Sequence, residues 1–241
     1  GLSQESDKGK NFAEGYVYED VNKNGKKDRN EKGISDVMVS NQQEVVLTND
    51  EGFYKLPVEE NTIIHISKPA KYELLRDENN LPQFYYVHKP NGSPDLRFEG
   101  FESTGSLPSP LNFGLIPSKK KESFKAIVFG DPQPRTNEEL SYYRDDVVSE
   151  LAGSDADFTL VLGDIMFDNL SLYPRYNRMM ETLEMPVFNL FGNHDINFKS
   201  EGNKHARETF KKHYGPTYFS FAYGDVHFIA MNNIDFLGLK E

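Results

Sequence analysis

Three short polar motifs follow apolar runs in the second half of the chain. They are Gly130-Asp131-Pro132-Gln133, Gly163-Asp164, and Gly192-Asn193-His194-Asp195. Buried parallel strands present their carboxyl ends at one edge of a sheet, so polar side chains placed after three such strands are expected to converge. Carboxylates, amides and imidazoles are ligands for hard or borderline cations. The pattern predicts a metal-dependent hydrolase.

The segments around these motifs alternate between expected strands and expected helices. The strands are predicted at 124–129, 158–162 and 186–191, the helices at 136–153, 172–183 and 208–213, and a hairpin at 219–231. Continuous apolar strands separated by helical segments are typical of a parallel sheet that is covered on both faces. This region is therefore expected to have an α/β fold.

The residues before about position 120 follow another pattern, in which short alternating apolar runs are separated by turn residues. Strands are predicted at 16–18, 37–39, 45–48, 53–56 and 62–66, with a hairpin turn at Asn49-Asp50-Glu51-Gly52. This pattern indicates an all-β sandwich. We expect a disordered N-terminus at 1–11, the β-sandwich at 12–117, a charged linker at 118–123, and the α/β region at 124–241.

The composition excludes several classes of function. The 241 residues include 38 acidic and 27 basic side chains, giving a formal net charge of -11, and such a surface repels nucleic acid. Cysteine is absent, so neither disulfides nor thiolate metal sites can form. No apolar run approaches the roughly 18 residues that a membrane-spanning helix needs. The polar first residues are compatible with a signal peptide that has already been removed.

A twelve-residue segment of the N-terminal region fits the calcium-binding loop of EF-hands. The matching residues are Asp20, Asn22, Asn24, Lys26 through its carbonyl, Asp28 and Glu31, with Gly25 at the sharp turn. Predicted strands flank the loop, so it more closely resembles the calcium loops of bacterial cell-surface β-sandwich repeats of the SdrD B kind. The alternative is a solvated hairpin loop, because Asn and Asp also favour turns. A structural calcium ion there would favour an exported protein.

Residues 124–235 resemble the calcineurin-like metallophosphoesterase superfamily. The resemblance rests on the order of the three motifs and on their spacing of about thirty residues. It implies the first part of an α/β/β/α sandwich and two divalent metals of the manganese, iron, zinc or magnesium class. By this resemblance Asp131 and Gln133 bind one metal, Asp164 bridges both and Asn193 binds the second. His194 then faces the substrate and Asp195 holds its ring.

These residue types suit phosphate ester hydrolysis. A carboxylate between two cations about 3.5–4 Å apart makes a site where bound water loses a proton near neutral pH and attacks phosphorus. A histidine beside the cations protonates the leaving oxygen, and a neighbouring carboxylate fixes its tautomer. Arg175 follows the second motif and is a candidate contact for a substrate phosphate.

The chain departs from the family pattern at two motifs. Gln133 stands where the opening Asp-x-His has its histidine, and we interpret it as the mark of a subfamily with an Asp-Pro-Gln opening. The second motif is more commonly Gly-Asp-x-x-Asp, whereas Phe167 has that spacing here and Asp168 comes one residue later. Asp168 is therefore expected beside the metal ligands without being one itself.

The later family motifs, a lone histidine and a Gly-His-x-His element, are not found. No histidine follows His227, and His205, His213 and His227 precede the region where the family places its later ligands. We expect this chain to be the first part of a longer hydrolase, or to be completed by another chain.

Two hypotheses follow. The first is a metallophosphoesterase that acts on a small phosphorylated substrate, a mono- or diester, in the periplasm, on the cell surface or outside a bacterial cell. The second is a non-catalytic exported binding or surface-scaffold protein whose phosphoesterase-like domain is incomplete.

Overall fold

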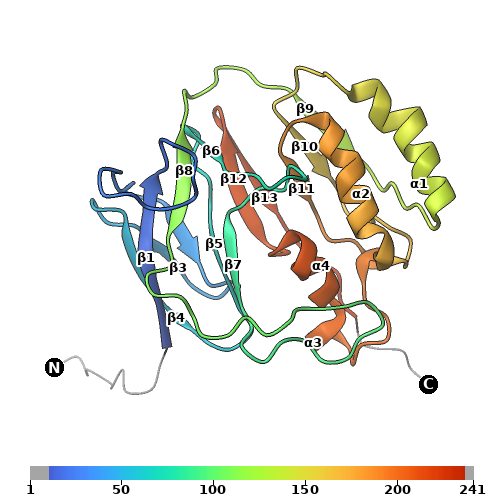
Figure 1. Cartoon of the computed structure of the whole chain (residues 1–241), viewed down its shortest axis with the longest axis horizontal. Coiled ribbons are helices and arrows are strands. Elements are labelled where there is room, and N and C mark those ends of the chain that lie inside the picture. Colours follow the sequence, from blue (N-terminus) through green and yellow to red (C-terminus); the bar gives the residue numbers. More distant parts are fainter. Residues whose placement is uncertain (1–10, 237–241) are drawn as a thin grey trace.

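A computed structural model of the chain describes residues 11–236. The expected disordered segment 1–11 lies outside the described residues, except for Asn11, which begins the first strand. From left to right, Figure 1 shows the N-terminal strands, the hairpin β12–β13, the parallel strands β9 to β11, and the helices α2 and α1. The predicted α/β fold with a β-rich N-terminal region is confirmed.

Two four-stranded sheets make up the N-terminal region. Their strand orders are β4-β1-β8-β6 and β3-β2-β5-β7, and only the pair β1 and β8 is parallel. The strands are β1 Asn11–Glu19, β2 Met38–Ser40, β3 Val45–Leu47, β4 Phe53–Val58, β5 Thr62–Ile66, β6 Tyr72–Leu74, β7 Tyr85–His88 and β8 Phe113–Pro117. Each of the five predicted strand segments overlaps one of them.

The turn at Asn49–Gly52 forms, but it does not join a hairpin as predicted. The backbone N–H of Gly52 donates to the carbonyl of Asn49 at 2.8 Å. However, β3 pairs with β2 and β4 pairs with β1, so the turn carries the chain from one sheet to the other. The reason is length: β1 offers a partner to all six residues of β4, whereas β3 has only three residues.

The second region is built on a three-stranded parallel sheet with the order β11-β10-β9. Its elements are β9 Ala126–Phe129, α1 Asn137–Tyr143, β10 Phe158–Val161, α2 Tyr173–Met180, β11 Val187–Asn189, α3 Asn203–Ala206 and α4 Glu208–Tyr214. Thr136 caps the N-terminus of α1, where its side chain accepts a hydrogen bond from the N–H of Glu139. The helical segment continues to residue 151 as a π-helical turn and a 3-10 turn, close to the predicted end.

The hairpin of β12 Phe219–Tyr223 and β13 Val226–Ala230 covers the face of the parallel sheet opposite α1 and α2 (Figure 1). Aromatic rings fill the space between them. The ring of Phe221 stacks on Phe188 of β11 with centroids 4.1 Å apart, and Phe158 of β10 packs edge-on to it. The same core continues to Ile66 and other residues of the N-terminal sheets.

Polar contacts also join the two regions. The Lys68 ammonium donates to the carbonyl of Ala222 at 2.8 Å and lies over the ring of Tyr223. The Lys89 ammonium lies 2.9 Å from a carboxylate oxygen of Glu208 in α4, and both side chains are buried. The N-terminal region therefore supports the sheet that carries the motifs. Among the helices of residues 11–236, none combines the length and the apolar character needed to cross a bilayer.

Candidate active site

Three loops meet at the carboxyl end of the parallel sheet. They follow β9, β10 and β11 and carry the three motifs. Backbone hydrogen bonds join them, from Gln133 N to Asp164 O at 3.1 Å, from Phe167 N to Pro134 O at 3.2 Å, and from Asp168 N to His194 O at 3.2 Å. The loops therefore lie side by side, as the strand pattern predicted.

Four residues of these loops have left-handed backbone conformations. The φ angles are 58° at Asp131, 46° at Gln133, 48° at Asp164 and 60° at Asp168. Residues other than glycine rarely adopt this region, and such conformations cost about 1–3 kcal/mol each. Strained residues of this kind persist where surrounding contacts hold them, which is common at functional sites. Because four of them lie in the motif loops, this edge of the sheet is the candidate functional site.

Gly163 and Gly192 stand where the second and third loops touch. A Cβ at Gly192 would lie 2.1 Å from both the backbone nitrogen and the Oδ1 of Asp164, and a Cβ at Gly163 would lie 3.0 Å from the Cα of Gly192. Only glycine allows so close an approach. Gly192 thus sets the position of the Asp164 carboxylate.

Gly192→Ala is expected to displace Asp164 and to weaken divalent-metal binding by about 10–100-fold, the usual effect of disturbing groups that orient a ligand. Titration with manganese measures the loss. Gly130→Ala is the matched control, because a Cβ there meets no atom within 4 Å. Equal metal affinities for the two variants would contradict the steric argument.

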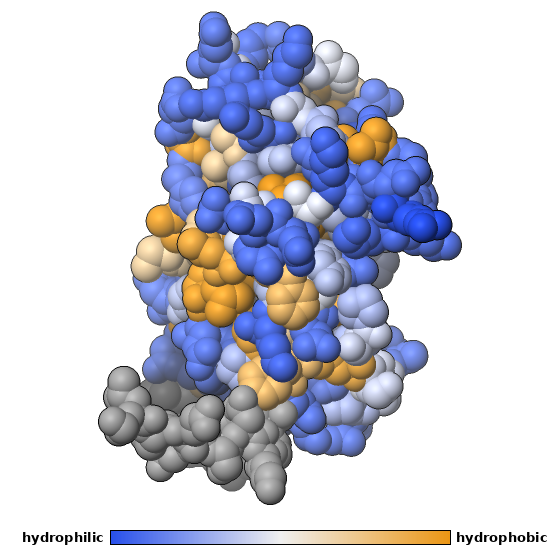
Figure 2. All heavy atoms as spheres, turned by 90° about the vertical axis from the view of Figure 1, so that its left-hand side faces the viewer, coloured by the Kyte–Doolittle hydropathy of each residue, from blue (hydrophilic) through white to orange (hydrophobic). Residues whose placement is uncertain are grey.

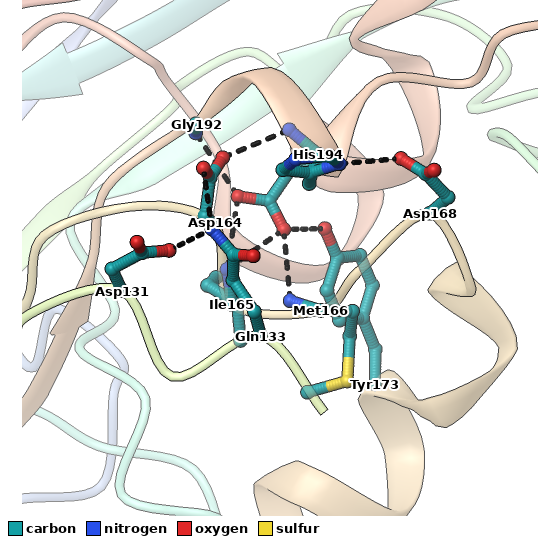
Figure 3. A network of polar contacts seen from close by, with 10 residues as sticks. Asp131, Gln133, Asp164, Ile165, Met166, Asp168, Tyr173, Gly192 and His194 are labelled. Carbon is teal, nitrogen blue, oxygen red and sulfur yellow. Dashed lines mark hydrogen bonds and ion pairs between the residues drawn. The ribbon is translucent and has the colours of Figure 1, made fainter. Parts of the chain in front are cut away.

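The oxygen-bearing side chains of the first two motifs converge on one point. The amide nitrogen of Gln133 donates to Asp131 Oδ1 and, at 3.1 Å, to Asp164 Oδ2 (Figure 3). The other oxygen of Asp164 accepts the N–H of His194 at 2.8 Å. Two carboxylates that share one donor are placed to share a cation, and rotation of the amide presents its oxygen to the same point. This donor set fits a hard divalent metal.

His194 is held by Asp168. Its Nδ1 lies 2.8 Å from Asp168 Oδ1 (Figure 3). Its ring stacks on Phe167, with centroids 4.0 Å apart and planes 23° apart. A carboxylate on Nδ1 fixes the imidazole tautomer and leaves Nε2 for chemistry. The left-handed turn at Asp168 absorbs the extra residue of the second motif, so that Asp168 reaches the ring while Phe167 covers it.

Asp195 has another role than the one predicted. Its carboxylate is fully buried and accepts hydrogen bonds from Gly192 N at 3.0 Å, Ile165 N at 3.1 Å and Tyr173 Oη at 2.8 Å. Burial raises the pKa of Asp195 to about 7, although these hydrogen bonds oppose the shift. The prediction that Asp195 holds the His194 ring is therefore wrong, because its oxygens are used to clamp the second loop to the third.

Comparison with known families decides the assignment. A family model described as calcineurin-like phosphoesterase matches residues 124–239, and a model described as the N terminal of calcineurin-like phosphoesterase matches residues 21–103. The chain carries a domain of the calcineurin-like phosphoesterase family, preceded by that family's N-terminal region. Members normally act as metal-dependent phosphoesterases with two divalent metals. No curated protein matches the chain.

The donor set of this phosphoesterase is incomplete among the described residues. Within 11–236, no three side chains of His, Asp or Glu are grouped so that they could hold a metal ion. The side chain of Asn193 is exposed and makes no hydrogen bond to a described residue. His205 pairs with Glu208, and His227 is exposed on β13. Asp131, Gln133 and Asp164 are the ligand candidates that the structure brings together.

The prediction that Arg175 contacts a substrate is not supported. Its guanidinium donates to the backbone and side-chain oxygens of Asn137 at 2.8 and 2.7 Å and to Ser141 Oγ at 2.7 Å. These bonds tie α2 to α1. Arg175 is occupied in holding the two helices together.

The calcium-type loop of residues 20–31 is closed by its own hydrogen bonds. Asp20 is fully buried and accepts from the N–H groups of Asn24 and Gly25, while Asp28 accepts from the amides of Asn22 and Asn24. The Glu31 carboxylate accepts from two backbone N–H groups of the loop. The side chains of the loop face one another, and nitrogen donors satisfy their oxygens.

Sequence reasoning missed three contributors to the site. They are Arg135, whose guanidinium lies over Phe167, Phe167 itself, and Tyr173, which donates to Asp195. The only available signal was the shifted spacing of the second motif, which placed an aromatic residue where the family more commonly has Asp.

Proposed function

We propose that this phosphoesterase hydrolyses phosphate mono- or diesters of small molecules, with two divalent cations held by Asp131, Gln133, Asp164 and Asn193. One observation carries the proposal: the carboxylates of Asp131 and Asp164 converge on the Gln133 amide at the carboxyl end of the sheet. Bound there, the cations would neutralise phosphate charge and activate water as the nucleophile.

The residues around this point supply the rest of the chemistry. The Asp168 carboxylate holds the His194 ring through Nδ1, so that Nε2 is left to face the leaving oxygen. In its doubly protonated form the ring would give the Nε2 proton to that oxygen and keep the Nδ1 proton on the bond to Asp168. Phe167 covers one face of the ring and restricts its rotation. Asp195 accepts hydrogen bonds from Ile165 in the second loop and from Gly192 in the third. These bonds fix the position of His194 relative to Asp164.

We further propose that additional polypeptide completes the ligand set, from beyond Glu241 or from another chain. The exposed edges of two strands support this proposal. Val128 of β9 is 53% exposed, Ile229 of β13 is 69% exposed, and Met231 just after it is 73% exposed. β9 and β13 each lie at the end of their sheet among the described residues, so their outer backbone N–H and C=O groups can pair with a further strand. A strand added beside β9 would reach the first motif loop, which follows Phe129.

Turnover of p-nitrophenyl phosphate and of its bis ester in manganese tests the function. The chain, a C-terminally extended form, Asp164→Asn and Asn193→Ala are compared. We expect the extended form to hydrolyse at least one of the two esters, and we expect Asp164→Asn to abolish this turnover. Equal background rates in all four proteins would overturn the proposal. Activity restricted to the extended form would assign the missing ligands to the added residues.

A second candidate function is binding without catalysis. An apolar groove of about 350 Å³ lies between the N-terminal strands and the hairpin, and its lining includes Met38, Val45, Tyr218, Ile229 and Met231. Figure 2 shows the side of the molecule with the N-terminal strands, where a hydrophobic group interrupts a largely hydrophilic surface. Exposed apolar patches mark contact sites in soluble proteins. A chain that forms complexes but never hydrolyses either ester would favour this candidate.

We also propose that the loop of residues 20–31 binds a structural calcium ion. The carboxylates of Asp20, Asp28 and Glu31 and the amides of Asn22 and Asn24 have the oxygen chemistry for it, together with the carbonyl of Lys26. Calcium is expected to raise the unfolding midpoint by several degrees, and a chelator is expected to reverse the change. Asp28→Asn should lose the effect. An unchanged midpoint in millimolar calcium would refute this site.

A further inference from the structure

Arg135 forms the outer layer of a stack that includes His194. Its guanidinium carbon lies 4.2 Å above the ring centroid of Phe167, and Phe167 stacks on the His194 ring at 4.0 Å. Since the imidazole covers one face of Phe167, the guanidinium occupies the other. The order is therefore Arg135, Phe167, His194, with one aromatic ring between the cation and the imidazole.

The guanidinium of Arg135 has no polar partner among the described residues. It is exposed and forms neither an ion pair nor a hydrogen bond there, in contrast to Arg144, which pairs with Asp145, and Arg175, which bonds to α1. The cation is held in place only by its contact with Phe167. Its hydrogen-bond donors are all free for a ligand.

The backbone at Arg135 is fixed. Its N–H donates to Glu139 Oε2 at 2.6 Å, and its carbonyl accepts from the Asn169 amide at 3.4 Å. Pro134 precedes it, and Thr136 caps α1 directly after it. Arg135 is therefore held in position beside the site, which lowers the entropy lost when a ligand binds.

A cation beside the site offsets the negative charge of the protein and of the motif loops. The protein has a formal net charge of -11, and Asp131, Asp164 and Asp168 lie in the motif loops. A substrate with two anionic groups would be repelled at its second group unless a cation met it there. Arginine suits this task, because its planar fork binds carboxylate and phosphate through paired hydrogen bonds.

We propose that Arg135 binds a second anionic group of the substrate, a carboxylate or a second phosphate, on the far side of Phe167 from His194. This selects phosphate esters that carry a further negative charge. The inference rests on the proposed function, because it places the reacting phosphate beside His194. The Phe167 ring keeps the guanidinium away from that phosphate, so Arg135 determines specificity and does not act on the reacting atoms.

A pair of ligands that cannot be hydrolysed tests the proposal. 3-Phosphonopropionate and propylphosphonate differ by a carboxylate in place of a methyl group. Their affinities in manganese are measured by calorimetry for the unmodified chain, Arg135→Gln and Arg178→Gln, the last being an exposed arginine of α2 that serves as the charge-matched control. We expect the unmodified chain to prefer 3-phosphonopropionate by about tenfold, as one exposed charge-assisted contact allows.

Arg135→Gln should remove the preference and leave propylphosphonate affinity within about twofold, while Arg178→Gln retains the preference. Phe167→Leu, which deletes the ring beneath the guanidinium, should also reduce it and provides a second variant should Arg135→Gln fail to fold. An unmodified chain that binds both ligands equally, or an Arg135→Gln variant that keeps the preference, would overturn this inference alone. Failure of both the unmodified chain and its C-terminally extended form to bind either ligand would overturn the proposed function as well.

Discussion

Asp168→Ala is expected to lower turnover by about 10²–10⁴-fold, the range that one positioned proton donor contributes. The variant loses the carboxylate that lies 2.8 Å from Nδ1 of His194, so the ring is free to adopt the wrong tautomer and orientation. Manganese affinity should stay within about threefold, because Asp168 is not among the ligand candidates. The readouts are kcat, KM and metal content of the active form of the protein.

Asp195→Ala is expected to lower the stability of the fold, whereas Asp168→Ala is expected to lower turnover, so the two variants distinguish the roles of the two carboxylates. Its removal leaves the N–H groups of Gly192 and Ile165 and the hydroxyl of Tyr173 without their buried acceptor. Each unmet donor costs about 1–3 kcal/mol, so the variant should lose stability in chemical denaturation. A stable Asp195→Ala with low turnover, beside a fully active Asp168→Ala, would restore the assignment predicted from sequence.

Lys89→Ala should lower the free energy of unfolding by about 3–5 kcal/mol, the usual result of breaking a buried ion pair. Glu208 would keep its charge in a site that is 7% exposed, with Ser93 and His205 as its remaining partners among residues 11–236. Denaturant titration measures the loss. The double variant Lys89→Met with Glu208→Met should recover much of it, because no uncompensated charge remains.

Lys55→Ala is the control for the effect of losing a lysine. Lys55 pairs with Glu14 at 3.7 Å, and both side chains are more than two-fifths exposed. Exposed pairs of this kind contribute about 0–1 kcal/mol. If Lys89→Ala were as mild as Lys55→Ala, the contact between the loop at Lys89 and α4 would not stabilise the fold.

The sequence was sufficient for β1 to β5, for most elements of the second region, and for the edge of the sheet where the site lies, but not for β6 to β8. The apolar runs before Gly130, Gly163 and Gly192 have one structural solution, parallel strands whose following residues share an edge. Alternation of apolar residues likewise located β1 to β5. These features follow from the local periodicity of apolar residues, which can be recognised in a single sequence.

The exchange of roles between Asp168 and Asp195 could not be read from the sequence. It depends on the φ angle of 60° at Asp168, which turns the side chain after Phe167 back toward His194. Adjacency in the chain made Asp195 the obvious partner of His194, yet consecutive residues of the 3-10 turn Asn193–Asp195 point in different directions. Local backbone geometry decided between two carboxylates that composition could not distinguish.

Contacts between residues far apart in the chain could not be predicted from the sequence either. Lys89 and Glu208 are 119 residues apart, and nothing near either one indicates the other. Each residue has the composition of an exposed surface position. The topology that places the loop after β7 under α4 converts two ordinary charged residues into a buried pair.

The central claim is that the carboxylates of Asp131 and Asp164 form a divalent-metal site. Calorimetric titration of the chain with manganese, beside Asp164→Asn and the exposed control Asp225→Asn, tests it most directly. At least one equivalent of manganese should bind to the unmodified chain and to Asp225→Asn, with an affinity that falls by about 10–100-fold or more in Asp164→Asn. Manganese binding that is absent from the unmodified chain, or unchanged in Asp164→Asn, would contradict the claim.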